Sequence, residues 1–420
     1  MGTTFNKTTF AWILYDFANS AYTTLIITFI YATYFTQAIA PDKITGTALW
    51  SRGITITAIA VALLSPIMGA LADLGGYRKK FLFSFTFVNI ITTALLFTAL
   101  PGQVYYALTW VIISNIAFEM ANVFYNAYLP DIAPKEKIGR ISGYGWAFGY
   151  VGGLLAMFIA LIGFVDADPA WFGFSGDDGE NIRATNLVVA IWFAIFAGPF
   201  FIIVKDRKRP IPVRGIQLIK GAFTDLFKTL KNINRYRNIA RFLLARLIYN
   251  DGLITIFAFG GIYAAGTFNF SFKDIMIFGV VLNIAAGIGA YIMGFVDDRI
   301  GGKKTIQISL WCLIIATFLA VFTPYRWLFW VAGVMVGIFS GPNQAASRSL
   351  MGRLTPKERI NEFFGFFALS GKFTAFMGPF LLGVLTDLFD SQRAGVAVVA
   401  LFFILGSIVL TTVKDTEKSY

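Results

Sequence analysis

Six ionisable residues stand in the middle of long apolar segments, where charged side chains are rare. They are three acids and three bases: Asp16, Glu119, Asp251, Arg246, Arg348 and Lys372. At the centre of a membrane helix each costs roughly 2.5–3.5 kcal/mol on insertion scales, so such residues usually face a cavity or a partner. Because the six charges cancel, they suit internal ion pairs or a bound zwitterion.

The acids are interpreted as carriers of a coupled proton. The chain has no histidine, so proton transfer near neutral pH has to use carboxylates. Burial favours the neutral form of a carboxylic acid, and an approaching cation favours the charged form again. The hypothesis assigns proton coupling to Asp16 and Glu119, with Asp251 in reserve.

The bases are interpreted as ligands for a substrate carboxylate. Arg348 suits bidentate contact best, and Arg246 and Lys372 complete the set. For Lys372, a structural ion pair with Asp16 or Asp251 is the alternative.

Polar residues recur at helical spacing on four segments, which places each set on one helix face. The sets are Asp16, Asn19, Ser20 and Thr23; Asn115, Glu119, Asn122 and Asn126; Arg246 and Asn250; and Ser340, Gln344 and Arg348. We predict that they line a cavity and that Tyr15 also binds substrate there. For the amides, hydrogen bonding between helices is the alternative. Further aromatic residues that could line the same space, although packing is their commoner role, are Trp12, Tyr22, Tyr125, Trp146 and Tyr150.

The composition predicts an integral membrane protein. The 420 residues are 57% hydrophobic and only 14% charged, whereas soluble chains carry about a quarter charged residues. Soluble enzymes, secreted scaffolds and nucleic-acid binders are therefore disfavoured. Twelve segments are long and apolar enough for spans: 9–39, 49–73, 80–100, 104–131, 138–164, 184–204, 238–266, 273–297, 304–323, 326–352, 359–386 and 394–413.

The distribution of Lys and Arg predicts the orientation. Of the 35 basic residues, 26 fall on the side of the termini and six on the opposite side. By the positive-inside rule, both termini and the central loop are cytoplasmic in a prokaryotic-type inner membrane. The basic charge is thus a topology signal and predicts no nucleic-acid partner. Because the first segment lacks a signal-peptide pattern, we expect a permanent span there.

The central loop contains an amphipathic helix by its spacing. Lys220, Lys228 and Lys231 lie outside its apolar row, as in a helix that rests on an anionic leaflet. We interpret it as a bridge between two halves, with a regulatory lipid site as the alternative. The apolar row comprises Ile216, Ile219, Phe223, Leu226, Phe227 and Leu230.

The two halves resemble each other at an offset of 222–225 residues. Segment 69–79, GALADLGGYRK, matches 294–304, GFVDDRIGGKK, and PKEKI at 134–138 matches PKERI at 356–360. Gly143 and Gly149 fall on Gly365 and Gly371. Such duplication is typical of secondary transporters. The predicted domains are 1–204, a linker at 205–237, and 238–420.

The two glycine-rich turns resemble the signature of the major facilitator superfamily. The resemblance implies an all-α fold of two six-helix bundles. It also implies gate latches, with Asp73 near the start of segment 359–386 and Asp298 near the start of 138–164. Leu74 departs from the pattern, because a base is usual there, so we expect a weaker first latch. The implied gating residues are Gly69, Asp73, Gly76, Arg78, Gly294, Asp298, Arg299, Gly301 and Lys303.

Longer motifs resemble the vacuole-effluxer-like branch of that superfamily. They are WILYDFANSAY at 12–22, NAYLPDI at 126–132, GRISGYGW at 139–146, QAASRS at 344–349, FFG at 363–365 and SGK at 370–372. Fungal members of the branch are associated with amino-acid export from the vacuole. The resemblance implies a small solute of the amino-acid class.

We therefore predict a proton-coupled secondary transporter of a small zwitterion, working by alternating access as a monomer in contact with membrane lipids. The alternatives are a sugar, peptide, lipid or drug as substrate, or a receptor or scramblase. No phosphate loop, metal-site spacing or nucleophile elbow is present in the sequence, so we expect neither an enzyme nor a cofactor.

Overall fold

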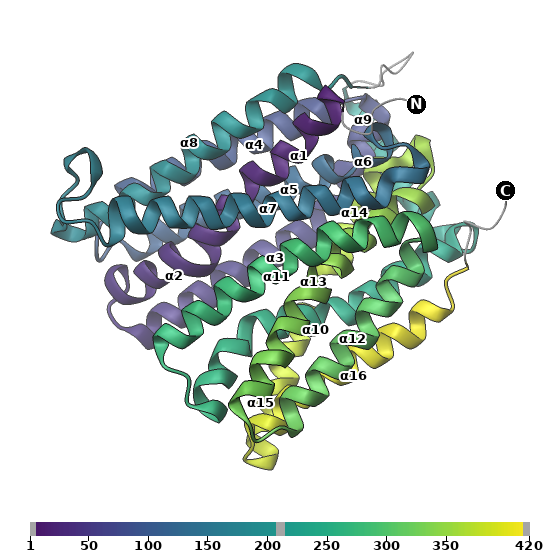
Figure 1. The fold of residues 1–420 in the computed structure, drawn as a ribbon. Helices are drawn as coiled ribbons and strands as arrows, with labels where there is room; N and C mark the ends of the chain where they lie inside the picture. Colours follow the sequence, from purple (N-terminus) through teal and green to yellow (C-terminus); the bar gives the residue numbers. More distant parts are fainter. Residues whose placement is uncertain (1–5, 207–214, 415–420) are drawn as a thin grey trace.

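The computed structural model describes residues 6–206 and 215–414, and within these ranges its regular structure is entirely helical. Figure 1 shows long helices running side by side, with both chain ends at one end of the molecule. We call this end the terminal side and the opposite end the far side. The first half contains α1 (Lys7–Ala21), α2 (Ile30–Tyr34), α3 (Lys43–Gly75), α4 (Arg78–Leu95), α5 (Val104–Asn126), α6 (Leu129–Ile132), α7 (Ile138–Ala160) and α8 (Glu180–Ile203).

The second half follows the short helix α9, at Ile216–Lys231, which lies on the terminal side. Its helices are α10 (Arg237–Phe268), α11 (Phe272–Ile300), α12 (Gly302–Phe322), α13 (Arg326–Leu354), α14 (Ile360–Lys372), α15 (Met377–Phe389) and α16 (Gln392–Thr411).

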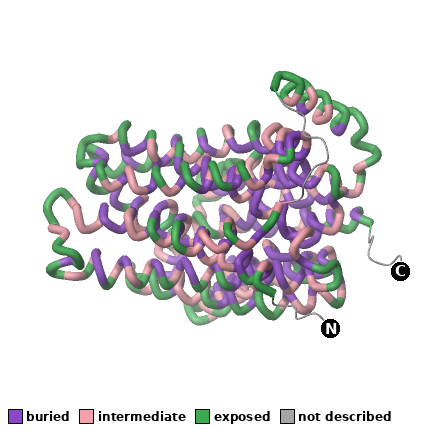
Figure 2. The backbone as a smooth tube through the Cα atoms, turned by 90° about the horizontal axis from the view of Figure 1, so that it is seen from above, coloured by how far each residue is buried: buried purple, intermediate pink, exposed green. Residues whose placement is uncertain are grey.

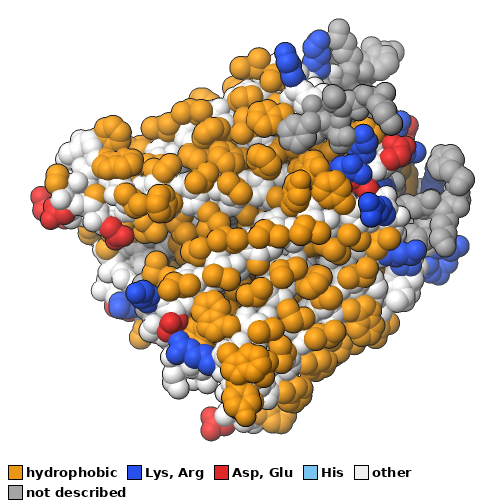
Figure 3. Space-filling model, viewed as in Figure 1, with side chains coloured by type: hydrophobic (Ala, Val, Ile, Leu, Met, Phe, Trp, Pro, Cys, Tyr) orange, Lys and Arg blue, Asp and Glu red, His pale blue; other side chains and the backbone are white. Residues whose placement is uncertain are grey.

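Eleven helical segments among the described residues are long and apolar enough to cross a membrane. They correspond to eleven of the predicted spans. Figure 3 shows hydrophobic side chains over the middle of one face and most of its Lys and Arg at the terminal side. Segment 326–352 forms the 29-residue α13 but is not among the eleven, because polar residues such as Gln344 and Arg348 interrupt its apolar sequence.

Several predicted spans are not continuous α-helices, and two of them bear on the site. The first contains π-helical turns at Tyr22–Phe29 and Phe35–Ile39, a geometry that is frequent at functional sites. The predicted helix 359–386 is interrupted between α14 and α15. There the Gly371 carbonyl accepts a hydrogen bond from Asn250 Nδ2 at 3.1 Å, and the Ala375 N–H bonds to the Lys372 carbonyl instead. A long-range contact therefore replaces a helical hydrogen bond.

The two halves meet most closely where helices cross at glycines. A Cβ on Gly69 of α3 would lie 2.3 Å from the Asn361 carbonyl oxygen of α14, and one on Gly365 would lie 2.3 Å from the Ser65 carbonyl. The α7–α11 crossing is similar, since a Cβ on Gly143 would lie 2.4 Å from the Ala290 carbonyl. In Figure 2 buried residues gather toward the terminal side. The halves are thus tightly packed on that side.

We predict that Gly69→Ala lowers the melting temperature of the purified protein in detergent. The new methyl group collides with backbone that cannot rotate away, and overpacking of this kind costs about 1–3 kcal/mol. Gly198→Ala in α8 is the matched control, because a Cβ there meets nothing within 4 Å. Equal melting temperatures for the two variants would contradict the close packing.

Candidate functional site

A cavity of about 400 Å³ lies between the two halves and extends from mid-helix toward the far side. We call it the central cavity. Helices α1, α7, α10, α11 and α13 and the π-helical turn at Tyr22–Phe29 contribute to its wall. Among the described residues that line it there is no Asp, Glu, Lys or Arg. Its lining instead combines hydroxyl groups with aromatic rings, including Ser20, Thr23, Thr24, Thr28, Phe29, Trp146, Tyr150, Thr255, Tyr263, Phe278 and Phe329.

The threonine hydroxyl groups of the first span donate hydrogen bonds to backbone carbonyls of their own helix. Thr24 Oγ1 donates to the Ser20 carbonyl at 2.9 Å, and Thr28 Oγ1 donates to the Thr23 carbonyl at 2.9 Å. The oxygen lone pairs therefore remain available to a solute. The sequence pattern identified Ser20 and Thr23 but missed Thr24 and Thr28, although these two follow Ser20 at four-residue intervals, a spacing that indicates one helix face.

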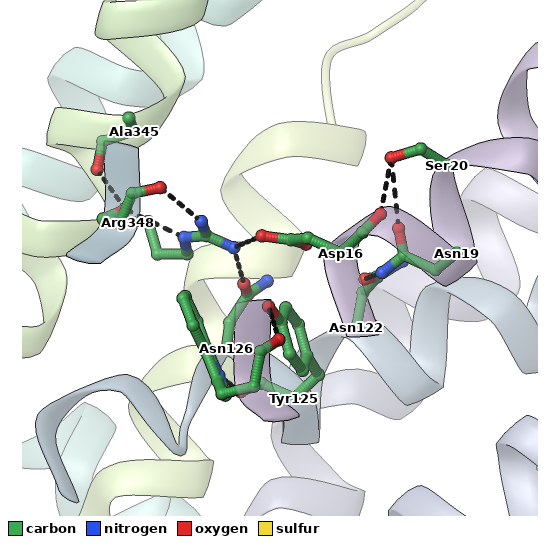
Figure 4. Close-up of polar contacts among 10 residues, drawn as sticks. Asp16, Asn19, Ser20, Asn122, Tyr125, Asn126, Ala345 and Arg348 are labelled. Carbon is green, nitrogen blue, oxygen red and sulfur yellow. Dashed lines mark hydrogen bonds and ion pairs between the residues drawn. The ribbon is translucent and has the colours of Figure 1, made fainter. Parts of the chain in front are cut away.

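A buried ion pair joins the halves below the cavity, toward the terminal side (Figure 4). Arg348 Nη1 of α13 lies 2.8 Å from Asp16 Oδ2 of α1. The guanidinium also donates to Asn126 Oδ1 at 3.2 Å, and to the Ser142 hydroxyl and carbonyl at 3.0 and 2.8 Å. Trp12 lies under it, with the ring centre 4.7 Å from Cζ. Every side of this guanidinium is therefore occupied by protein.

Helix α7 makes room for the pair and separates it from the cavity. A Cβ on Gly145 would lie 2.3 Å from Asp16 Oδ2 and 2.7 Å from Arg348 Nη2. The next residue, Trp146, lines the cavity and has its ring centre 5.8 Å from the Arg348 Cζ. The pair thus lies one aromatic layer below the central cavity.

A second ion pair crosses between the halves from α5 to α14. Lys372 Nζ lies 2.7 Å from Glu119 Oε1, and the two side chains are 32% and 21% exposed. The Asp16–Arg348 pair is 12% and 4% exposed, so the Glu119–Lys372 pair is the more accessible one. The alternative interpretation of Lys372, an ion pair with Asp16 or Asp251, is wrong about the partner. The end of α14 lies opposite α5, where Glu119 is the acid within reach.

The other two charges remain within the second half. Arg246 donates to the Phe367 carbonyl at 2.7 Å and to Ser370 Oγ at 2.9 Å, and it stacks on the Phe367 ring. Asp251 accepts a hydrogen bond from Thr374, in the interruption between α14 and α15, at 3.1 Å. Both side chains are therefore held against the interrupted helix.

The predicted amides connect helices below the cavity. Asn19 Nδ2 donates to Asn122 Oδ1 at 3.2 Å, and Gln344 Nε2 donates to Asn250 Oδ1 at 3.4 Å. These contacts match the alternative of hydrogen bonding between helices. None of the nine residues predicted to bind substrate lines the central cavity. Eight of them lie beneath it instead, in the ion pairs and hydrogen bonds described above.

Tyr15 does not take part in these contacts. Its ring stacks on Tyr125 at 4.5 Å, with Phe193 and Phe200 against its edges, and its hydroxyl bonds to Thr86 Oγ1 at 2.6 Å. The side chain is fully buried. Tyr15 therefore packs inside the first half, and its role in substrate binding stays a prediction.

Asp73, at the end of α3, caps the start of α14. Its carboxylate accepts the Glu362 N–H at 2.8 Å, the Asn361 N–H at 3.3 Å and Asn361 Nδ2 at 2.8 Å. This first latch therefore joins the halves by hydrogen bonds, at the position the family resemblance implies.

Asp298, at the end of α11, caps the start of α7 in the same way. It accepts the Gly139 and Arg140 N–H groups at 2.8 and 3.2 Å and pairs with the Arg140 guanidinium. Arg353 lies 3.7 Å away. This second latch thus has charged partners in addition to backbone donors, and the expectation of a weaker first latch stays a prediction.

The remaining implied gating residues lie around these latches. Gly76 and Gly301 have φ of 66° and 89°, values that glycine adopts without strain. Arg78 bonds to Asp131 and Asp206, and Lys303 bonds to backbone carbonyls at the end of α16. Each base ties its own half together, whereas Arg299 is exposed. Gly294 packs against the Arg140 backbone.

Comparison with known proteins identifies the family. The family model described as "Vacuole effluxer Atg22 like" matches residues 42–420. The chain belongs to this family. It is 29% identical to the uncharacterized MFS-type transporter YxiO of Bacillus subtilis, over 99% of this chain and 96% of that one. Autophagy-related protein 22 of Yarrowia lipolytica is 23% identical, over 81% of this chain and 70% of its own length.

The fold agrees with this assignment. The proton:xylose symporter XylE, solved with 6-bromo-6-deoxy-D-glucose, superposes with a TM-score of 0.75 at 12% identity, covering 98% of this chain and 96% of the other. The protein is therefore a multi-pass membrane transporter of the major facilitator type, whose relatives are transporters and effluxers rather than enzymes. Within the described ranges no group of three or more His, Cys, Asp or Glu could hold a metal ion.

We predict that Arg348→Gln destabilises the protein by about 3–5 kcal/mol, because it leaves the Asp16 carboxylate buried without its cation. Adding Asp16→Asn recovers a large part of that loss. Melting temperatures of the single and double variants measure the coupling. The control is Arg326→Gln, which removes a surface contact to Asp274 and costs at most about 1 kcal/mol. Independent, additive effects at positions 16 and 348 would contradict the pairing.

Proposed function

We propose that this protein moves a small zwitterion of the amino-acid class across the inner membrane by proton-coupled alternating access. The observation that carries the proposal is the pair of ion bridges between the halves, Asp16–Arg348 and Glu119–Lys372, below a cavity that opens between the same halves. A zwitterion brings one carboxylate and one ammonium group. It can therefore replace both partners of such a bridge at once, so no buried charge is left alone.

The coupled proton acts on the same bridges in this proposal. Protonation of Asp16 or Glu119 removes the negative partner, and the basic side chain is then free to bind a substrate carboxylate. Asp251, whose carboxylate accepts a hydrogen bond from the Thr374 hydroxyl, is the reserve proton site. Release of both latches then opens the terminal side.

The proposed architecture is twelve spans in two six-helix bundles, 1–204 and 238–420, joined by 205–237. Helix α13 supplies the twelfth span. The latches support the internal repeat, because Asp73 and Asp298 are 225 positions apart and their donors, residues 361–362 and 139–140, are 222 apart. The excess of basic residues on the terminal side supports cytoplasmic termini, and one such unit contains a complete cavity, which supports a monomer.

A second substrate class is favoured by the cavity lining. Hydroxyl and aromatic groups without a charged residue suit an uncharged solute such as a sugar or a drug. A thermal-shift screen with amino acids, dipeptides and sugars separates the classes, since a ligand at 100 times its Kd adds about 2.7 kcal/mol to stability. Stabilisation by sugars and not by amino acids would overturn the zwitterion proposal.

We predict that Asp16→Asn and Glu119→Gln keep exchange of a labelled amino-acid mixture in proteoliposomes but lose accumulation driven by a pH gradient. Without the carboxylate the protein still binds and releases substrate, yet it no longer carries the proton. Asp387→Asn, an exposed acid on α15, is the control and retains accumulation. Full gradient-driven accumulation by both the Asp16 and the Glu119 variant rules out these proton sites.

A further inference from the structure

Helix α9 has three distinct faces. Ala222 and Thr229 are each 1% exposed and face the protein. An apolar row lies about 120° around the helix from them, given 3.6 residues per turn. Five of its six members are between 47% and 67% exposed: Ile216, Ile219, Phe223, Phe227 and Leu230. Lys220, Lys228 and Lys231 are exposed on the third face.

The buried face of α9 contacts both halves at the first latch. Gly221 lies against α3, since a Cβ there would be 3.3 Å from Leu74 Cδ1. On the other half, Arg359 donates to Thr229 Oγ1 and to the Asp225 carbonyl. Arg359 also lies 3.4 Å from the Glu362 carboxylate, and it is the Glu362 N–H that Asp73 binds. Helix α9 therefore bridges α3 and the start of α14.

This contact accounts for the departure of Leu74 from the usual basic residue. An apolar side chain at that position offers packing surface to α9, whereas the matching Arg299 in the second copy is exposed. The first latch, which has no ion pair at Asp73 among the described residues, is thus supported from outside by a separate helix.

The two outer faces of α9 indicate what covers it. An exposed apolar row beside three lysines is the pattern of a helix that lies in a membrane interface. Lysines near a negatively charged leaflet each strengthen binding. Because the apolar row is distinct from the face that contacts α3 and Arg359, α9 can bind lipid and support the latch together.

We propose that α9 binds an anionic membrane surface and thereby holds the first latch closed, so that opening of the terminal side responds to anionic lipid. The gating part rests on the proposed alternating access, but the lipid contact does not. Each of the two parts has its own readout.

The lipid contact is tested with a polarity-sensitive NBD label in the Cys312→Ser background. A label at Phe227→Cys, in the apolar row, shifts its emission to the blue in vesicles of phosphatidylcholine and phosphatidylglycerol, and less in phosphatidylcholine alone. A label at Thr224→Cys, exposed outside that row, is the control and does not shift. Equal emission at the two sites in the anionic vesicles overturns the lipid contact. Crosslinking of Phe227→Cys between two chains would identify a second copy as the occupant and also overturn it.

The gating effect is tested with spin labels at Lys135→Cys and Lys357→Cys, exposed positions in the turns before α7 and α14. In nanodiscs that contain phosphatidylglycerol, we expect most molecules to show the short distance between the two spin labels. The triple variant Lys220→Gln, Lys228→Gln, Lys231→Gln increases the long-distance population, by up to about five-fold per lysine. Lys304→Gln, an exposed base outside α9, is the control and leaves the distances unchanged. Distances that respond neither to lipid charge nor to the triple variant overturn the gating effect. If the protein transports nothing, both readouts remain measurable.

Discussion

A charge in the interior of a membrane protein is costly without a partner, and in this protein the partners of four such charges come from different halves of the chain. Asp16 meets Arg348, and Glu119 meets Lys372. Neither half can neutralise these side chains with the partners it has in this structure. Separating the halves therefore costs the free energy of leaving these buried charges without partners. Any movement that separates them must supply new partners.

The two latches and the close glycine crossings between the halves lie on the same side of the central cavity as these ion pairs. Glycines let α3 cross α14 and let α7 cross α11, while Asp73 and Asp298 cap the helices that begin there. Closed packing on the terminal side and a cavity toward the far side are therefore two aspects of one arrangement. Substrate and protons are, in our proposal, the new partners that allow the arrangement to change.

The helical pattern and the identity of the charged residues were readable from the sequence. Span lengths follow from the apolar runs, and α9 follows from the spacing of Ile216 to Leu230. The cavity lining was not predictable in the same way. The lining combines residues of helices that are far apart in the chain, and the interruption after Lys372 depends on Asn250, which lies 122 positions earlier in the sequence. Local periodicity carries no signal for either.

By itself the sequence determined that the protein is an all-helical membrane transporter, that six charges lie in its core and that two turns carry an aspartate. These properties follow from composition and from short-range spacing. Only the tertiary structure decided which acid meets which base, that Tyr15 packs inside the first half, and that α9 rests on the first latch. Such pairings depend on how distant helices cross, and a crossing is fixed by packing between segments that are far apart in the chain.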